Sequence, residues 1–526
     1  MNLITDAWIA VRRRSGAIQT ISPAEIVSAI SEDPIVDFNE CRPDFNGAAA
    51  QFLIGLLQTC ATPGSGMWRD WYESPPSVDE LQDAFLELKE VFELVGKGSR
   101  YMQDQGLEDA EPKEVASLLL EAPGGQTVRN NADHFIKQGG VSALGLRNAA
   151  LALLTLQINA PAGGKGFRTS LRGGGPLTTL VAPDPNIEPL ERRTLWHLLW
   201  LNVLDQDQLG QLTDAHGDQH QALADRFPWL APCRTSDPKG VGETRPSDAH
   251  FLQTYWACPR RIWLEMDADP GHCSLSGEAG PVVHRYRTRN YGANYQGPWE
   301  HPLSPYYRTK EGEWLPLHPQ PGGIGYRHWG AYVFAREERG RAAAVVRAAK
   351  NDFDRPRRTL LWAFGFDMDN MKARAWYEAW MPILKVSDAV YPEFERRVDE
   401  LLASAERVAD AIRSAIKEAW FRPGLTVRGD LNAPLAAFWS ATESEFYVVL
   451  FGVLEALENN AEDRTLRESW FVILSNTAMR LFDEWAASGD FGHENPKRIA
   501  KAGLKLRNIL NGKTIKGLLI PREQAA

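Results

Sequence analysis

The residues best suited to chemistry lie in one glycine-rich stretch, residues 161–180, which reads PAGGKGFRTSLRGGGPLTTL. It holds six glycines, three cations and no carboxylate. Gly163, Gly164 and Gly166 can adopt positive φ, which lets another molecule approach the main chain closely. Successive backbone N–H groups in such a turn form a concave anion site. The stretch therefore predicts either an anion-binding surface or a tight surface turn between two elements. Its cations are Lys165, Arg168 and Arg172.

This stretch does not match the common nucleotide-binding motifs. The order GGKGFRTS lacks the G-x-x-x-x-G-K-[ST] spacing of a P-loop, and it also lacks the dinucleotide fingerprint. Asp367 and Asp369 suggest a metal pair, but two carboxylates without a third ligand are weak evidence, and N-capping of a following helix is favoured. A phosphate-handling enzyme, with the glycine loop as its anion cradle and these carboxylates as metal ligands, stays open as the alternative function.

Two further stretches have residue types that suit nucleic acid. Residues 285–295, RYRTRNYGANY, interleave cations and amides that can read base edges with rings that can stack on bases. A solvent-facing strand whose rings pack inward is the alternative. Asn370 and Met371, at an exposed tip, would form a polar and apolar wedge of the kind that enters a base step. Cys258, His272 and Cys273 lack paired C-x₂-C spacing, so no zinc site or other metal site is expected.

The net charge of −10 argues against a uniformly basic nucleic-acid-binding surface, but the charges are segregated. Residues 134–183 and 279–299 contain no Asp or Glu. Such segregation favours contact with a polyanion, although part of the first window also fits a buried helix. Residues 493–526 hold eight Lys and Arg against two Glu, which predicts either a solvated face or a phosphate or partner contact. The cations of the two windows are Lys137, Arg147, Lys165, Arg168, Arg172, Arg285, Arg287 and Arg289.

The elements that position these residues show two kinds of sequence pattern. Up to residue 366, helices alternate with short scattered strands and show no regular βαβ rhythm, which predicts an irregular α+β domain. An edge strand is expected over Met1–Val11, a helix over Val141–Ile158 and a strand over Leu177–Val181. Periodic apolar residues over 386–421, 438–455, 465–485 and 496–510 predict an antiparallel four-helix bundle. The predicted domains are 1–370, α+β, and 371–526, the bundle.

Length and composition fit a globular protein of two or three domains. No stretch approaches the roughly 20 apolar residues of a membrane span. The five scattered cysteines and the opening MNLITDAWIAVRRR, which lacks the order of a secretory signal, predict a cytoplasmic protein.

Six stretches spread over nearly the full chain can be compared with a known family. They are MNLITDAWIAV at 1–11, YMQ at 101–103, HFIK at 134–137, APAGGKGFRTSLRGGGPLTTL at 160–180, WEHPLSP at 299–305 and GFDMDNMKARAWYE at 365–378. Together and in this order they resemble the CasA family, the large subunit of the type I-E CRISPR Cascade surveillance complex. The glycine loop and the GFDMDNMKA stretch are the most specific.

The resemblance implies a non-catalytic subunit without cofactors, built from an α+β domain and a four-helix bundle. It implies recognition of the PAM in double-stranded target DNA from the minor-groove side, opening of the duplex and recruitment of a helicase–nuclease. The implied partners are crRNA, target DNA and the backbone, small and handle-binding subunits of Cascade. A protein-only scaffold stays open as a third hypothesis.

Residue by residue, the resemblance assigns four sets of contacts. The PAM-facing glycine loop is Ala162, Gly163, Gly164, Lys165 and Gly166, and the minor-groove finger is Arg289 or Asn290. The wedge is Asp369, Asn370 and Met371. Backbone-contacting cations are Arg308 and Lys310, and the anchor near the crRNA handle is Phe135 with Lys137. Lys165 replaces a glycine of some relatives, and Asn290 replaces a lysine.

Overall fold

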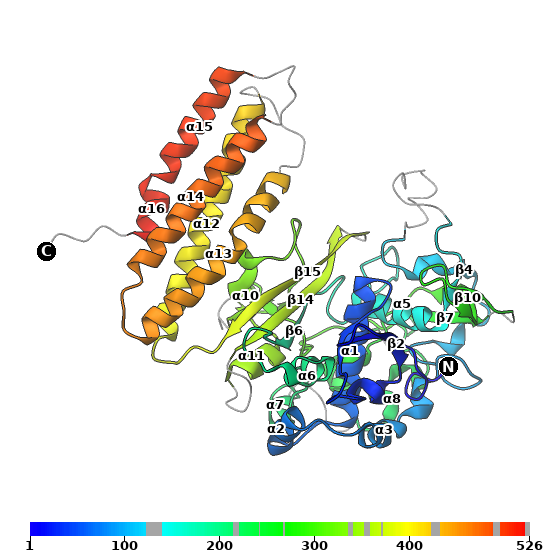
Figure 1. Cartoon of the computed structure of the whole chain (residues 1–526). Helices are drawn as coiled ribbons and strands as arrows, with labels where there is room; N and C mark the ends of the chain where they lie inside the picture. The colour runs from blue at the N-terminus through cyan, green and yellow to red at the C-terminus, as the bar shows by residue number, and fades with distance from the viewer. Residues whose placement is uncertain are drawn as a thin grey trace. The chain divides into compact units, whose positions relative to one another are not determined.

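The computed structural model describes residues 1–122, 139–213, 220–240, 242–266, 269–334, 340–351, 358–369, 372–421, 432–487 and 495–520. The chain forms two compact units, Met1–Pro319 with Ala335–Ile383 and Gln320–Phe334 with Leu384–Ala526 (Figure 1). The boundary expected at 370/371 lies between two strands that belong to the first unit up to Ile383, so the main segment of the second unit begins later, at Leu384. A short earlier segment, Gln320–Phe334, also belongs to the second unit. The second unit is therefore discontinuous in the sequence, whereas the predicted domains are two consecutive ranges.

The first unit opens with a three-stranded antiparallel sheet in the order β2-β1-β3, formed by β1 (Ile9–Arg13), β2 (Ile18–Ile21) and β3 (Ile35–Phe38). The expectation of an edge strand over Met1–Val11 is wrong, because β1 begins only at Ile9 and is the central strand. Upstream, the Asn2 carboxamide oxygen accepts hydrogen bonds from the backbone N–H of Ile4 (3.0 Å) and of Thr5 (3.2 Å). This local turn competes with strand formation.

A second sheet is built around β10 (Val282–Arg289). It pairs antiparallel with β4 (Pro112–Glu114), β5 (Leu144–Gly145) and β7 (Arg261–Met266). The sequence pattern also predicts strands over Ile262–Met266 and Val282–Tyr286. Both are present, and β10 is longer than predicted. Its extension carries Arg287 and Arg289 to the end of the strand.

The core of this unit lies around two helices, α1 (Pro43–Cys60) and α5 (Leu146–Asn159). α5 is buried along most of its length, so part of the first acid-free window is indeed a core helix. Next to α1, aromatic rings meet edge to face, as between Phe52 and Trp256 at 5.8 Å. Such pairs stabilise a core beyond the area they bury.

The third main sheet, β15-β14-β6, contains β6 (Thr178–Pro183), β14 (Arg358–Asp369) and β15 (Lys372–Leu384). The helix expected to follow Asp369 is wrong, because residues 372–384 form a strand. Cross-strand stacking explains the difference: Trp362 on β14 stacks on Trp380 of β15 at 5.4 Å, and Phe366 meets Trp376 at 4.9 Å. Tertiary pairing outweighs the helix propensity of KARAWYEAW.

Shorter elements complete the first unit. A small sheet has the order β12-β11-β13. The bounds of these elements are α2 Ser65–Glu73, α3 Val78–Leu86, α6 Leu195–Trp200, α7 Gln206–Gly210, α8 Leu223–Arg226, α9 Gln253–Trp256, α11 Ala344–Asn351, β8 Gly271–His272, β9 Ala279–Gly280, β11 Tyr306–Arg308, β12 Trp314–Pro316 and β13 Gly340–Arg341.

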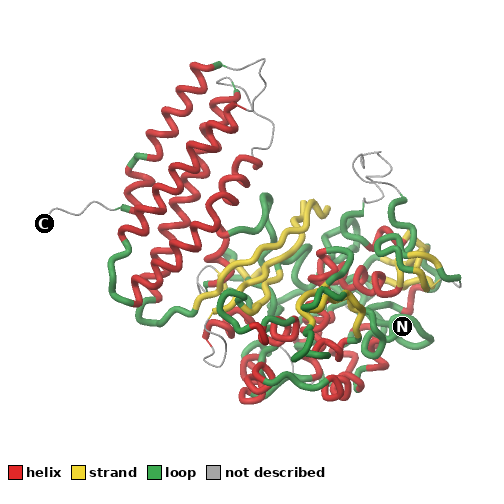
Figure 2. The backbone as a smooth tube through the Cα atoms, in the orientation of Figure 1, coloured by secondary structure: helices red, strands yellow, loops and turns green. Residues whose placement is uncertain are grey.

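The second unit is the expected bundle. Its long helices are α12 (Tyr391–Trp420), α13 (Asn432–Glu458), α14 (Arg464–Ala487) and α15 (Pro496–Leu510), followed by the short α16 (Lys513–Leu519). Successive long helices run antiparallel (Figure 1), and Figure 2 shows how their regular helices contrast with the strands and loops of the first unit. The fold-class prediction is confirmed. None of the described helices is both long and apolar enough to cross a membrane.

The segment Gln320–Phe334 joins the bundle through buried aromatic contacts. Tyr326 stacks on Phe446 with ring centroids 4.5 Å apart, and its hydroxyl shares a 2.8 Å hydrogen bond with Thr442. The same segment includes α10 (Trp329–Val333).

Candidate nucleic-acid interface

The glycine loop leaves the end of α5 and turns sharply. Gly163 and Phe167 form an isolated antiparallel bridge, and between them Gly164 and Gly166 take φ of +22° and +81°. A Cβ placed on Gly164 would meet nothing within 4 Å, so the backbone there faces open space. A Cβ on Gly166 would come within 2.9 Å of the Tyr291 ring. Gly164 therefore leaves the loop surface accessible, and Gly166 permits close packing of the loop backbone against the Tyr291 ring.

The loop is held against the segment that follows β10. The backbone N–H of Tyr291 donates to the Gly166 carbonyl at 2.7 Å, and the Asn290 amide donates to the Lys165 carbonyl at 2.6 Å. Tyr291 itself has φ of +63°, a conformation that few non-glycine residues adopt. The structure thus brings together two stretches that the sequence singled out separately.

Two exposed cations lie where the glycine loop contacts the segment after β10. Lys165 and Arg289 are both exposed, and neither forms an ion pair within the described part of the chain. Asn290 is half-buried, and its amide already donates to the loop. Arg289 is thus better placed than Asn290 to reach a ligand.

Phe167 supports the loop from its far end. The Arg260 guanidinium lies over the Phe167 ring at 4.9 Å and donates to the Pro161 carbonyl, while the Lys113 ammonium lies 5.6 Å from the same ring. Burial lowers the pKa of Arg260 to about 10. Sequence reasoning missed Arg260 and Lys113, because neither lies in an acid-free window and only the sheet brings them here.

Other cations of the two windows have structural roles. Arg168 donates to the Ser236 hydroxyl at 2.7 Å. Arg285 and Arg287 both pair with Glu265, at 3.4 and 2.5 Å. Arg147 pairs with Glu40 and Glu278. The carboxylates largely neutralise Arg147, Arg285 and Arg287, so the windows overstate the free positive charge.

Arg172 is a clear correction. Its side chain is buried and bonds Gln51 (2.5 Å), Ser304 (2.9 Å) and Thr178 (3.1 Å). Desolvation lowers the pKa of the guanidinium to about 10. It ties the loop to α1 and β6 and adds no charge to the loop surface.

The carboxylates of the GFDMDNMK stretch are also corrected. Asp367 is buried on β14 and accepts from Arg374 of β15 at 2.7 Å, so it is no helix N-cap. Asp369 is exposed and lies 3.6 Å from the same guanidinium. No three His, Cys, Asp or Glu side chains of the described ranges converge as metal ligands would. Asn370 and Met371 lie outside the described residues.

Of the remaining predicted contacts, Arg308 and Lys310 lie at the β11–β12 hairpin and are exposed. Arg308 lies over the Trp314 ring at 5.8 Å. The chain beyond β12 is bonded to the glycine stretch, since His318 and the Gly175 carbonyl are 3.0 Å apart. Phe135 and Lys137 lie outside the described residues.

Comparison with known proteins covers nearly the whole chain. The family model of CRISPR-associated protein Cse1 matches residues 2–481. A crystal structure of CasA from Thermus thermophilus superposes with a TM-score of 0.66 at 18% identity, covering 97% of this chain and 99% of that chain. Cse1 from Acidimicrobium ferrooxidans gives 0.66 at 18% identity, covering 99% and 98%. A chain of a structure titled "CRISPR RNA-guided surveillance complex" gives 0.62 at 17% identity, covering 97% and 99%.

Proposed function

The chain belongs to the CRISPR-associated Cse1 family, and from that membership we propose that it is the non-catalytic large subunit of a crRNA-guided DNA surveillance complex. The similarity to a chain of a solved surveillance complex supports this role. Its partners are then crRNA, target DNA, the other Cascade subunits and a helicase–nuclease, and its compartment is the cytoplasm. The enzyme alternative is weakened, because Arg374 occupies Asp367, one of its two metal-ligand candidates.

Within that role we assign PAM recognition to the surface formed by residues 162–166 with Arg289. One observation carries the assignment: Asn290 and Tyr291 bond the loop backbone at Lys165 and Gly166, which sets an open main-chain turn beside two cations that form no ion pair within the described residues. Lys165 and Arg289 supply charge for a narrow anionic groove. The minor groove mainly distinguishes A·T from G·C pairs, which suits a sensor that leaves sequence specificity to guide pairing.

Asn290 has a different role from the finger. Its amide donates to the Lys165 carbonyl, so we assign it to positioning the loop. Of the two residues that the resemblance offered, Arg289 is therefore the one that enters the groove.

We assign duplex opening to Asp369, the last residue of β14, with Asn370 and Met371, which precede β15 in the sequence. The ion pair between Asp367 and Arg374 joins the two strands near these residues. Inserting a wedge costs about a few kcal/mol of unstacking per base step, and the loop and finger contacts offset that cost. Arg308 and Lys310 are assigned to DNA backbone contacts, and Phe135 with Lys137 to the crRNA handle.

Arg289→Gln tests the assignment against a matched variant, Arg285→Gln, on the same strand. Arg285 is likewise exposed but pairs with Glu265. In the reconstituted complex we expect Arg289→Gln to weaken binding of PAM-containing duplex by about 1–3 kcal/mol, while Arg285→Gln changes it little. Equal effects of the two variants would remove Arg289 from the finger role.

A further inference from the structure

The last two helices carry a charge pattern that the proposed function leaves unused. Residues 496–519, α15 and α16, contain seven Lys and Arg and no Asp or Glu, in a chain of net charge −10. This segment also lies beyond residue 481, where the match to the family model ends. Its cations are Lys497, Arg498, Lys501, Lys505, Arg507, Lys513 and Lys516.

These cations lie on the solvent side of the bundle. α15 buries Ala502, Leu506 and Leu510, one turn apart, against its neighbours. Lys497, Lys501 and Lys505 are exposed and follow one stripe outside this buried face at the i, i+4, i+8 spacing. At 1.5 Å per residue they span about 12 Å along the helix axis.

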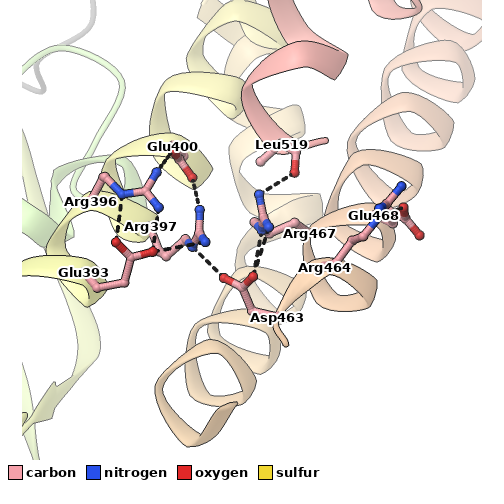
Figure 3. A network of polar contacts seen from close by, with 9 residues as sticks. All are labelled: Glu393, Arg396, Arg397, Glu400, Asp463, Arg464, Arg467, Glu468 and Leu519. Atoms are coloured by element: carbon pink, nitrogen blue, oxygen red, sulfur yellow. Dashed lines mark hydrogen bonds and ion pairs between the residues drawn. The ribbon is translucent and has the colours of Figure 1, made fainter. Parts of the chain in front are cut away.

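Several exposed arginines elsewhere in the bundle are paired. On α14, Arg464 pairs with Glu468 one turn away (3.0 Å) and Arg480 pairs with Glu484 (2.7 Å). Figure 3 shows the same alternation where Arg396 and Arg397 lie between Glu393 and Glu400. Like charges at i, i+4 destabilise a helix, so the lysine stripe of α15 has no local benefit.

Most of the seven cations of α15 and α16 have no carboxylate partner within the described residues. Lys505 pairs with Glu418 at 2.8 Å, and Arg498 donates to the carbonyls of Ala419 and Trp420. Lys497, Lys501, Arg507 and Lys513 form no ion pair within the described residues. A compact row of unpaired cations on a rigid helix attracts a polyanion.

An exposed apolar side chain lies beside the stripe. Leu504 is 60% exposed and lies one turn after Lys501 on the exposed side of α15. A duplex presents sugars and phosphates to a convex helix, whereas an unpaired strand also presents base faces that an apolar side chain can cover. Cations at one-turn intervals beside the apolar Leu504 side chain therefore favour binding of a single strand over binding of a duplex.

We propose that the exposed face of α15, continued by Lys513 of α16, binds the backbone of single-stranded nucleic acid. This site lies in the bundle unit and uses none of the residues assigned to the PAM. It therefore stands or falls independently of the proposed PAM surface.

The test is binding of the full chain to an oligodeoxythymidine of about 30 nucleotides, enough for several contacts, measured by fluorescence anisotropy over a salt series. Both arms carry Lys165→Gln and Arg289→Gln, which removes the proposed PAM surface. One arm adds Lys497→Gln and Lys501→Gln, and the matched control adds Arg464→Gln and Arg480→Gln. The two arms lose the same charge from exposed helix positions of one bundle.

We expect the lysine variant to bind at least about tenfold more weakly at about 0.1 M salt, and its slope of log K against log salt to fall by about 1.4, because each single-strand phosphate contact contributes about 0.7. The control should keep the parent slope, and circular dichroism should show equal helicity in both arms. Equal slopes in both arms would overturn the proposal. Tighter binding of the matched duplex would also overturn it, and an oligouridine arm distinguishes DNA from RNA as the strand.

Discussion

Single side chains decide which charges on this molecule are free. Arg172 and Arg289 both lie in acid-free windows, yet one is buried in a polar cluster and the other is exposed without an ion pair in the described part of the chain. Sequence spacing could not separate them, because Gln51 and Ser304, which satisfy Arg172, are far away in the chain. The sequence did identify both Lys165 and Asn290, but not the hydrogen bond between them.

The glycine loop depends on the absence of a side chain at Gly166. Gly166→Ala forces a side chain into φ of +81° and against the Tyr291 ring, so we expect a loss of about 1–3 kcal/mol in unfolding free energy and a loss of PAM binding. Gly16→Ala is the matched control, because Gly16 has φ of +91° with nothing within 4 Å. Urea unfolding and duplex binding measure the pair. If Gly16→Ala weakens PAM binding as much, the loop has no special role.

Secondary-structure elements were predictable from the sequence where one apolar face of a helix packs against a single hydrophobic core. The bundle helices follow from their 3.6-residue period, because Phe394, Val398 and Leu401 are buried as that period requires. The β14–β15 hairpin was not predictable, because the cross-strand stack of Trp362 on Trp380 decides it. The same sheet turns Asp367 from a supposed helix cap into the partner of Arg374.

The bundle also contains a buried ion cluster that joins helices. Asp463, just before α14, pairs with Arg397 of α12 at 2.6 Å and with Arg467 of α14 at 3.0 Å, and Arg467 donates to the Leu519 carbonyl at the end of α16 at 2.8 Å (Figure 3). The carboxylate therefore links α12 to α14, and Arg467 extends the cluster to the end of α16. Asp463 and Arg467 are both buried.

Asp463→Asn should destabilise the bundle by about 3–5 kcal/mol, because it leaves the buried Arg467 without the carboxylate it pairs with, whereas Arg397 keeps Glu393 and Glu400. The exposed pair offers a control: Glu468→Gln should cost less than about 1 kcal/mol. Hydrogen exchange of residues 391–420 and 464–487 reports the loss. Similar protection in the two variants would show that the cluster adds no stability.

At the scale of the whole molecule, acid stability depends on buried neutral histidines. His197 is buried between Thr194 and the Tyr72 carbonyl, and desolvation lowers its pKa from 6.5 to about 4. The unfolded chain then takes up a proton first as pH falls. The stability that neutral His197 contributes is therefore full above about pH 6.5 and is lost between about pH 6.5 and 4.

His197→Gln keeps a donor for the Tyr72 carbonyl and removes the titration. We expect the variant to lose about 3 kcal/mol less than the parent chain between about pH 7 and pH 4, at about 1.4 kcal/mol per pKa unit. Denaturant unfolding at several pH values measures this difference. Parallel pH profiles for variant and parent would contradict the assignment to His197.

We propose that this chain reads the PAM within a guided complex. The most direct measurement is binding of a duplex library with randomised PAM positions by the complex reconstituted with and without the chain. With the chain, a limited set of PAMs should be enriched, and Lys165→Gln with Arg289→Gln should flatten that enrichment while guide pairing to a pre-melted target persists. The same PAM enrichment without the chain, or with the doubly substituted chain, would contradict the account.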